Sequence, residues 1–555
     1  MYNMIKVTFN GQTKEFPQGM TLKEISEHFS ETFNFPIVLA KADNHLMELG
    51  KVLRKDCKLE FYDRSSRQGN FTYGRSLQFM LVLAVKRILG KEAKLIIEHS
   101  VEKGFYCCID NKKLTEKIIK EIEEEIKKIS LQDLMFTKMN VDRLDAIKYF
   151  EQEGQLDKAS TFKYISNSYI NLYRLDDMYD YFYSELAYST GQIDDFKLTL
   201  IDQNGFVVNF PSTSHPEYTL DYKHYNVLFN EFREYATWTK TLNITNASDL
   251  NLEISKGNNE QMIQLSEAHY NSQISRIADE IALKKKNVKI ILIAGPSSSG
   301  KTTTSKKLEI YLRSQGISTH QISIDDYFKN RDETPVDKDG NFDFETIKAL
   351  DLKLFNKDLE KLLKKEKVLL PEFNFIKGIK EYKNKYLQLK DNDIIIIEGL
   401  HALNDELTKN IQRESKYKIY ISPLTQLNID NHNRVHSTDI RKLRRITRDN
   451  KYRGLGAQET LEMWDKIRKG EEQFIYPYQD NVDCMINSSL LYEIGILKTY
   501  VEPLLFLVDE ESEFYPEALR LINFLRNFLP MPSDNVPRDS ILREFIGGSA
   551  YSKSV

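Results

Sequence analysis

The stretch that decides the fold reads Val288-Lys-Ile-Ile-Leu-Ile-Ala-Gly-Pro-Ser-Ser-Ser-Gly-Lys-Thr-Thr303. Its first seven residues form an apolar run of strand length, and the residues after it, 301–314, are predicted to be helical. Residues 295–302 fit the pattern GxxxxGK[ST] without a mismatch, and a strand before and a helix after are typical of a phosphate-binding loop. The residues expected to bind ATP are Gly295, Pro296, Ser297, Ser298, Ser299, Gly300, Lys301, Thr302 and Thr303.

The residue types in this loop explain the chemistry that it would perform. Gly295 and Gly300 allow the backbone to curl so that successive N–H groups face a polyphosphate, and the helix N-terminus adds positive potential. We expect Lys301 to reach the β- and γ-phosphates and the Thr302 hydroxyl to hold Mg²⁺. The alternative is a glycine- and serine-rich turn without chemistry, and the flanking strand and helix argue against it.

Carboxylates follow two further predicted strands. Residues 317–324 lead into Asp325 and Asp326, and residues 394–397 lead into Glu398. Ligands of open α/β sheets bind at the carboxyl ends of strands, so one carboxylate could orient Mg²⁺ and the other could accept a proton from an attacking hydroxyl. The alternative for Asp325 or Asp326 is a helix N-cap.

A run of arginines has helical spacing. Arg441, Arg444, Arg445 and Arg448 recur at intervals of three and four, and Arg453 lies just beyond them. Clustered guanidinium groups can stabilise the charge of a phosphoryl group in transit. A solvated helix face, a salt-bridge ladder or an RNA contact would produce the same spacing, so these alternatives stay open.

The amino-terminal half is predicted to contain two small units and a connector. Residues 1–63 alternate short strands with one helix in a β-grasp-like pattern, and residues 64–220 follow as a second α+β unit. Residues 221–286 are mostly helical. An interruption near 243–259 is rich in Asn, Ser, Asp and Gly, and we interpret it as a mobile linker.

The carboxyl-terminal half has a different pattern. Over residues 287–510 apolar strands alternate with longer helices, which predicts an α/β domain with a mostly parallel sheet. Residues 511–555 follow as a C-terminal extension. Because 555 residues are too many for one hydrophobic core, we expect a multidomain protein.

The composition is that of a soluble protein. Hydrophobic residues make up 41% and charged residues 29%, and the net charge of −4 gives no global drive toward nucleic acid or membranes. No apolar run approaches the roughly 20 residues that span a bilayer. The chain opens without a basic segment followed by an apolar one, and its four cysteines lack metal-ligand spacing. We therefore expect a cytoplasmic protein with reduced thiols.

Residues 288–507 resemble the uridine kinase and phosphoribulokinase family. After the loop, the resemblance is carried by Ser323-Ile-Asp-Asp-Tyr-Phe328, Asn341-Phe-Asp343, Pro371-Glu-Phe-Asn-Phe375, Ile397-Glu-Gly399 and Arg444-Arg-Ile-Thr-Arg-Asp449. It implies a kinase that uses ATP with Mg²⁺ and phosphorylates a nucleoside 5′-hydroxyl. In this family an aspartate similar in position to Asp325 acts as the general base.

The same resemblance implies roles for other residues. Glu398 would lie near the metal, together with Thr302. Arg444 and Arg448 would be lid arginines, and they would act in catalysis together with Lys301. The implied acceptor site consists of Asp325, Tyr327, Asp343, Phe373 and Arg453. Two departures bear on base and sugar recognition and leave the acceptor open: Leu455 replaces an arginine, and Lys377-Gly378 replaces a histidine.

The amino-terminal half resembles the non-catalytic N-terminal region of threonyl-tRNA synthetases, with residues 4–63 similar to a TGS domain. The second domain is matched through Arg75-Ser76, Val85-Lys-Arg-Ile-Leu89, Lys103-Gly-Phe-Tyr106 and residues 180–191. In the synthetases that domain edits mischarged tRNA with two pairs of His and Cys ligands. Those positions fall here on Arg75, Phe79, Phe182 and Leu186, so we expect no editing.

Three functions follow from these patterns. The first is a P-loop kinase of nucleosides or of another small hydroxylated acceptor. The second is an RNA- or ribosome-associated regulator that uses the loop as a nucleotide switch, although no NKxD tetrapeptide follows the loop. The third, an editing hydrolase, lacks its ligands. RNA contact through the amino-terminal half stays open under the first two.

Overall fold

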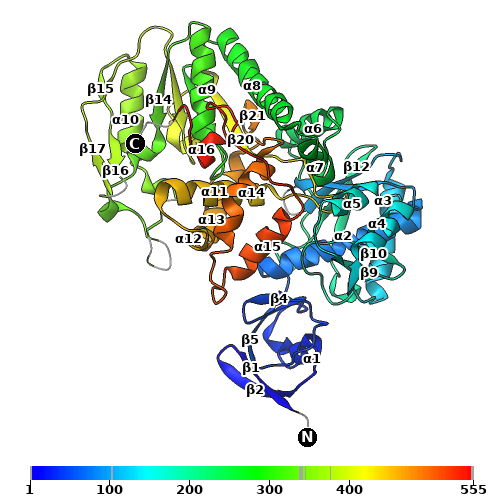
Figure 1. Ribbon diagram of the computed structural model, residues 1–555. Coiled ribbons are helices and arrows are strands. Elements are labelled where there is room, and N and C mark those ends of the chain that lie inside the picture. Colours follow the sequence, from blue (N-terminus) through cyan, green and yellow to red (C-terminus); the bar gives the residue numbers. More distant parts are fainter. Residues whose placement is uncertain are drawn as a thin grey trace.

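The computed structural model describes residues 3–101, 104–336, 340, 342–343, 346–374 and 377–551. Lys103, Asn341 and Phe375, which helped to carry the two resemblances, lie outside these residues. Figure 1 shows residues 4–63 as a separate unit at one end of the molecule, with the later regions packed together beyond it. The protein is therefore multidomain, as predicted.

Residues 4–63 form a five-stranded sheet around a short helix. Asn10 and Gly11 have positive φ angles of 47° and 76°, and they join the first two strands as a tight hairpin. Thr21 and Glu24 form the predicted capping box at the start of the helix. The elements are β1 (Met4–Phe9), β2 (Gln12–Pro17), α1 (Leu22–Glu27), β3 (Leu39–Ala42), β4 (His45–Met47) and β5 (Cys57–Tyr62), in the sheet order β2-β1-β5-β3-β4.

Residues 64–220 contain two antiparallel sheets and four helices. The longest helix begins where the Ser66 side chain accepts a hydrogen bond from the Gly69 amide, and α3 buries an isoleucine stripe at one face. The helices are α2 (Arg67–Leu89), α3 (Glu116–Leu131), α4 (Arg143–Gln152) and α5 (Leu156–Lys163). The strands are β6 (Leu95–Val101), β7 (Gly104–Ile109), β8 (Thr137–Asp142), β9 (Tyr169–Leu175), β10 (Met178–Asp180), β11 (Lys197–Leu200) and β12 (Gly205–Asn209).

The connector consists of α6 (Asn226–Thr241), α7 (Ala247–Ser255) and α8 (Asn259–Leu283). The interpretation of residues 243–259 as a linker is wrong, because α7 occupies most of this stretch. Its Asn, Ser and Asp residues are capping groups: the Asn246 side chain accepts hydrogen bonds from the amides of Ser248 and Asp249. Buried Leu250 and Asn251 then fix the helix against the rest of the molecule.

The carboxyl-terminal region is built on an all-parallel sheet in the order β14-β19-β13-β20-β21. Its strands are β13 (Ile290–Ala294), β14 (Thr319–Ser323), β19 (Ile394–Glu398), β20 (Lys416–Ser422) and β21 (Cys484–Asn487). Alternate residues of β13 belong to different clusters: Ile291 and Ile293 pack with α8, α9 (Lys301–Ser314) and α14 (Glu493–Leu505), and Ile290 and Leu292 pack with α10 (Leu352–Leu363). This sheet confirms the predicted α/β region.

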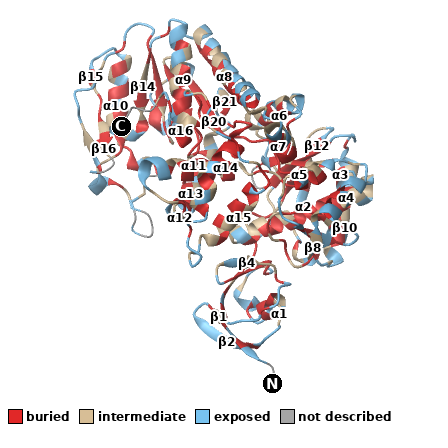
Figure 2. Cartoon of the chain, viewed as in Figure 1, coloured by how far each residue is buried: buried red, intermediate tan, exposed pale blue. Residues whose placement is uncertain are grey.

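Shorter elements complete this region. Two small antiparallel pairs join β15 (Val368–Leu369) with β18 (Tyr386–Leu387) and β16 (Glu372–Asn374) with β17 (Ile379–Glu381). Between β20 and β21 the chain forms α11 (Ser437–Arg453), α12 (Ala457–Glu462) and α13 (Trp464–Phe474). Figure 2 shows buried residues concentrated around α11 and α14.

The last part of the chain is folded into the same core. It contains α15 (Tyr515–Leu525) and the short α16 (Arg543–Ile546). One hydrophobic cluster joins Phe150 and Phe162 of the second unit, Ile274 of the connector, Ile291 of the sheet and Phe545 of α16. The second unit, the connector and the C-terminal extension therefore share a core with the parallel sheet, although the sequence suggests separate units.

Candidate active site

The loop at residues 295–302 connects β13 to α9 at the carboxyl edge of the sheet, and two glycines make its path possible. A Cβ atom on Gly295 would lie 2.1 Å from the Ile421 carbonyl oxygen, so no other residue fits between the two strands. Gly300 has a φ of 86°, and a Cβ there would lie 2.0 Å from the Ile541 side chain. The curl predicted from the sequence is present.

Several polar groups of the loop point to an anionic ligand. Within the part of the chain that the structure describes, the buried hydroxyls of Ser298 and Ser299 have no hydrogen-bond partner. The Lys301 ammonium donates to the carbonyls of Gly295 (2.9 Å) and Pro296 (3.2 Å), and Thr302 is exposed. Buried polar groups without partners are costly, and a phosphate at the start of α9 would satisfy them. The loop therefore fits a polyphosphate.

The predicted carboxylates lie at the same edge of the sheet. Glu398, the last residue of β19, is in register with Ser323 of β14 and with Ile293 of β13. Asp325 follows β14 on a 3-10 turn over Ile324–Tyr327. The alternative interpretation of this aspartate as a helix N-cap is wrong, because Asp325 lies inside the turn, which begins after Ser323.

The charges at this edge influence one another. The Asp325 side chain is accessible, yet the protein packed around it raises its pKa, and the Lys301 charge opposes this rise. Burial, with Asp325 as the next cause, raises the pKa of Glu398 to about 7. Burial lowers the pKa of Lys301, while Glu398 and Asp325 raise it. These opposing effects mean that Lys301, Asp325 and Glu398 share one electrostatic environment, as active-site groups commonly do.

Thr302 and Glu398 are the residues that could help to hold Mg²⁺. Among the residues that the structure describes, no group of three or more His, Cys, Asp or Glu side chains is arranged to hold a metal ion. Mg²⁺ in kinase sites is bound by one or two protein oxygens and the substrate phosphates, so a larger cluster is unnecessary. The exposed hydroxyl and the half-buried carboxylate fit this requirement.

The arginines of α11 support the loop from behind. Arg441, which is 2% exposed, donates to the Ser297 carbonyl (2.9 Å) and forms an ion pair with the buried Glu471. Glu471 in turn accepts a hydrogen bond from the Ser297 amide (2.9 Å). A solvated face is therefore the wrong interpretation for this arginine, because its guanidinium group is part of the wall behind the loop.

Arg444 is also enclosed. It has no exposed surface, and its guanidinium group donates to the Glu493 carboxylate (2.7 Å) and to the carbonyls of Ser488 (2.7 Å) and Ser298 (3.4 Å). The expectation of a lid arginine that meets the transferred phosphoryl group does not fit this position. The buried pair with Glu493 holds the side chain beneath the loop, where it can position Ser298.

The other end of the arginine helix is more open. Arg448 (2.8 Å) and Arg453 (3.4 Å) both form ion pairs with Asp449, and Arg453 is 52% exposed. The charge of Arg453, like that of Lys301, opposes the rise that burial causes in the pKa of Asp325. The salt-bridge interpretation is thus confirmed for this part of α11, and Arg453 lies within electrostatic reach of the proposed base.

The predicted acceptor residues differ in burial and in the contacts that they make. Tyr327 is 2% exposed, its hydroxyl donates to Asp358 (3.3 Å), and its ring meets Phe355 edge-on (5.0 Å). Its side chain is therefore core packing, and the expectation of acceptor binding is wrong for it. Phe373 is 6% exposed, and its amide donates to Asp326 (3.3 Å). Asp343 is half-buried, and its amide donates to the Pro335 carbonyl (2.8 Å).

Three glutamates of this site were not predicted from the sequence. Glu471 and Glu493 bind the arginines of α11, and Glu544 of α16 accepts hydrogen bonds from Thr303. Each lies between 30 and 241 residues from its partner along the chain, and none belongs to a motif. No local signal in the sequence could have found these contacts.

The four positions on which the resemblance places the synthetase editing ligands are packed or hydrogen-bonded within the protein. Phe79, Phe182 and Leu186 are buried, and the two rings lie 5.4 Å apart. The Arg75 guanidinium donates to the Glu185 carbonyl (3.1 Å). Phe79, Phe182 and Leu186 are therefore part of the hydrophobic core.

Comparison with known proteins assigns the two halves to different relatives. Residues 290–490 match the Phosphoribulokinase / Uridine kinase family. This match supports the assignment of the carboxyl-terminal region as a P-loop kinase. Solved structures with a likeness to this region include a possible uridine kinase from Bacillus stearothermophilus, which is 24% identical, with 24% of this chain and 70% of that chain covered and a TM-score of 0.20.

The amino-terminal region matches threonine–tRNA ligases. That of Acetivibrio thermocellus is 30% identical over 198 residues, which are 35% of this chain and 31% of the ligase, and that of Clostridioides difficile is 29% identical over 180 residues, which are 32% and 28%. The chain spans about a third of the length of the curated relatives that it matches. In the described residues, no helix combines the length and apolarity that a bilayer crossing requires.

Proposed function

We propose that this protein transfers the γ-phosphoryl group of ATP to the 5′-hydroxyl of a nucleoside. The observation that carries the proposal is that Lys301, at the start of α9, and the carboxylates of Asp325 and Glu398 lie at the same carboxyl edge of the parallel sheet, where their charges influence one another. A phosphate-binding lysine facing a carboxylate of raised pKa is what a kinase with a hydroxyl acceptor requires. The family match over residues 290–490 supports the same reaction class.

In the proposed reaction the loop amides and the hydroxyls of Ser298 and Ser299 bind the phosphates, and Lys301 neutralises their charge. Asp325 accepts the proton of the acceptor hydroxyl. The oxygen–phosphorus bond to the acceptor forms as the bond between the γ-phosphorus and the bridging oxygen breaks, and ADP leaves with the electron pair. Thr302 and Glu398 would hold Mg²⁺, and the ion would supply positive charge that offsets the charge developing on the phosphates.

The arginines divide into two proposed roles. Arg441 and Arg444 hold the backbone of the loop through the carbonyls of Ser297 and Ser298, so they act as positioning residues. Arg448 and Arg453 are grouped around Asp449, and we assign them to charge stabilisation near the transferred group. Asp343 and Phe373 remain the proposed acceptor contacts in addition to Asp325. These residues do not specify which nucleobase the acceptor carries.

A transfer assay with labelled ATP and a panel of nucleosides tests the proposal. Asp325→Asn should lower transfer by roughly 10²-fold or more, because the acceptor hydroxyl loses its proton acceptor. The matched control is Asp391→Asn, which makes the same change at an exposed carboxylate just before β19, at the opposite edge of the sheet. Transfer that is unaffected by Asp325→Asn contradicts the general-base role. ATP hydrolysis that responds to RNA and to no nucleoside would instead favour the switch.

RNA is the first partner to test for the amino-terminal half, since residues there match threonine–tRNA ligases. Titration of the full chain with tRNA at low and at physiological salt should show affinity that falls steeply with salt if phosphate contacts exist. Absence of binding at low salt would leave this half as a scaffold for the kinase region, with which its second unit shares a hydrophobic cluster.

A further inference from the structure

The C-terminal segment places a carboxylate on the phosphate-binding loop's helix. Glu544 of α16 accepts a hydrogen bond from the Thr303 amide (3.2 Å) and one from the Thr303 hydroxyl (2.6 Å). Thr303 is the third residue of α9, so its amide is among those at the helix N-terminus that lack an intrahelical partner. A negatively charged group thus already occupies one of the donors expected to bind nucleotide phosphate.

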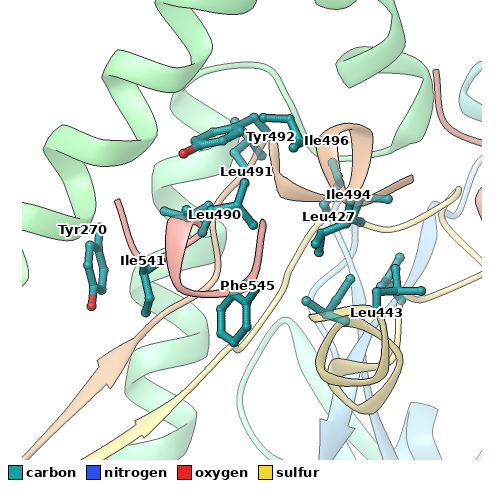
Figure 3. Packing of buried hydrophobic residues seen from close by; sticks show 14 of the residues in the cluster. Tyr270, Leu427, Leu443, Leu490, Leu491, Tyr492, Ile494, Ile496, Ile541 and Phe545 are labelled. Carbon is teal, nitrogen blue, oxygen red and sulfur yellow. The ribbon is translucent and has the colours of Figure 1, made fainter. Parts of the chain in front are cut away.

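The segment that carries Glu544 is firmly held. Ile541 packs against Gly300 of the loop, and the Phe545 ring lies 5.1 Å from the Arg444 guanidinium group. Figure 3 shows Ile541 and Phe545 among buried residues of the same cluster, with Leu490 beside them. Asp539 forms an ion pair with Lys307 (3.0 Å), and Lys306 donates to the Tyr551 carbonyl (2.6 Å). These contacts fix the backbone and leave Glu544 directed at Thr303.

A carboxylate and a phosphate can bind the same donors of this site. Both are anions that accept hydrogen bonds from amide and hydroxyl groups at a helix N-terminus, where the helix dipole favours negative charge. The two donors of Thr303 cannot serve both. Glu544 also lies within electrostatic reach of a second carboxylate, because its charge contributes to the raised pKa of Glu398. A bound polyphosphate would add to this repulsion.

We propose that Glu544 is a built-in competitor that occupies a phosphate position at Thr303 and lowers the affinity of the loop for nucleoside triphosphates. The inference rests on the proposed function, because it concerns the same polyphosphate site. Only the Glu544 side chain has to turn away for the ligand to bind, since Ile541 and Phe545 keep the segment in the core. The C-terminal segment thereby sets the nucleotide concentration at which the site fills.

Calorimetric titration of the full chain with three probes tests this. The probes are ATP, inorganic tripolyphosphate and adenosine, and the variants are Glu544→Gln and Glu544→Ala. We expect both variants to bind ATP and tripolyphosphate about tenfold more tightly than the wild type, because two charge-assisted hydrogen bonds no longer have to be broken. Adenosine should show no gain, since it carries no phosphate.

The matched control is Asp534→Asn, which removes one negative charge from the exposed surface of the C-terminal extension without touching Thr303. It should change polyphosphate affinity by less than about twofold, and thermal unfolding of each variant should show that the fold is kept. Unchanged or weaker polyphosphate binding by Glu544→Gln and Glu544→Ala overturns the proposal. If the wild type binds polyphosphate normally in that case, the proposed function stands. If no form binds any polyphosphate, both fail.

Discussion

The loop at residues 295–303 and the positions Arg75, Phe79, Phe182 and Leu186 both correspond to places where the resembled families carry out chemistry. In the loop, the hydroxyls of Ser298 and Ser299 are buried and have no hydrogen-bond partner among the residues described. At the other four positions the side chains are apolar and packed, or bonded to the backbone as Arg75 is. The loop therefore presents polar groups that a ligand could satisfy, whereas these four side chains are already packed or hydrogen-bonded.

This difference offers a criterion for deciding which half of a fused protein is active. A functional region holds polar groups at a cost in stability, whereas a region that has lost its chemistry can fill the space with hydrophobic side chains and gain stability. Substitutions in the two regions should therefore have opposite signatures. In the loop they should change activity, and at the packed positions they should change stability.

The largest expected effect belongs to the packed region. Phe79→Ala removes a fully buried ring that contacts Phe182, and it should lower the free energy of unfolding by about 3–5 kcal/mol. Urea unfolding measures this. Leu131→Ala in the same region is the control, because Leu131 is 87% exposed and should change stability by less than about 0.5 kcal/mol. A small effect of Phe79→Ala would mean that the position is not core.

Arg444 should show a mixed signature, because it lies between the core and the loop. Arg444→Met leaves buried Glu493 without its cation, and it should lower the free energy of unfolding by about 3 kcal/mol and weaken ATP binding. Arg444→Met with Glu493→Gln should recover at least half of the lost stability, since no charge remains uncompensated. If the double variant is as unstable as the single one, the ion pair is not the cause.

Lys301 should show the signature of a functional group. Lys301→Ala should lower phosphoryl transfer by about 10²-fold or more, equivalent to about 2.7 kcal/mol, because a preorganised positive charge is lost. The free energy of unfolding should change by less than about 0.5 kcal/mol. The control is Arg313→Ala, which removes a charge from the opposite end of α9. A loss of stability larger than the loss of transfer would contradict the distinction between the two regions.

Local patterns in the sequence were sufficient for much of the fold. The Thr21 and Glu24 capping box and the strand, loop and helix around residues 290–314 occur where predicted, because each depends on neighbours within a few residues. Helix α7 was missed because Asn246 and Asp249 are both turn formers and cap residues, and local composition cannot separate these roles. The shared hydrophobic core was also missed, because it joins residues hundreds of positions apart.

The same limit applies to the candidate site. The loop, Asp325 and Glu398 follow successive strands of a parallel sheet, so topology alone brings them to one edge. The direction of a side chain depends on tertiary packing, and this is why Tyr327 was expected to bind the acceptor and Arg444 to act as a lid arginine. Glu544 was missed for the same reason: its position over Thr303 depends on the path of the whole C-terminal segment.

His99 gives the smallest expected effect. It is the most demanding test of the distinction between functional and packed positions, because it is a polar side chain in the second unit. Its Nε2 atom is buried and has no hydrogen-bond partner among the described residues, as in the loop, yet its ring is stacked on Phe232 at 3.9 Å. Its Nδ1 atom lies 3.1 Å from the Gln426 amide nitrogen. The stacking indicates that His99 is a packing residue that must stay neutral.

Burial, with the charge of Arg434 as the second cause, lowers the pKa of His99 to about 3. Between that value and the pKa of about 6.5 of an unfolded histidine, only the unfolded state binds the proton, so stability falls as the pH drops through this range. From pH 7.5 to 5.0 His99 should contribute a loss of at most about 2 kcal/mol. Urea unfolding of His99→Phe at both pH values should show a correspondingly smaller loss than the wild type, whereas exposed His224→Gln should behave as the wild type does. Equal pH dependence in His99→Phe and wild type would mean that His99 accepts a proton in the folded state. The Nε2 atom of His99 would then be a candidate ligand-binding group and not part of the packing.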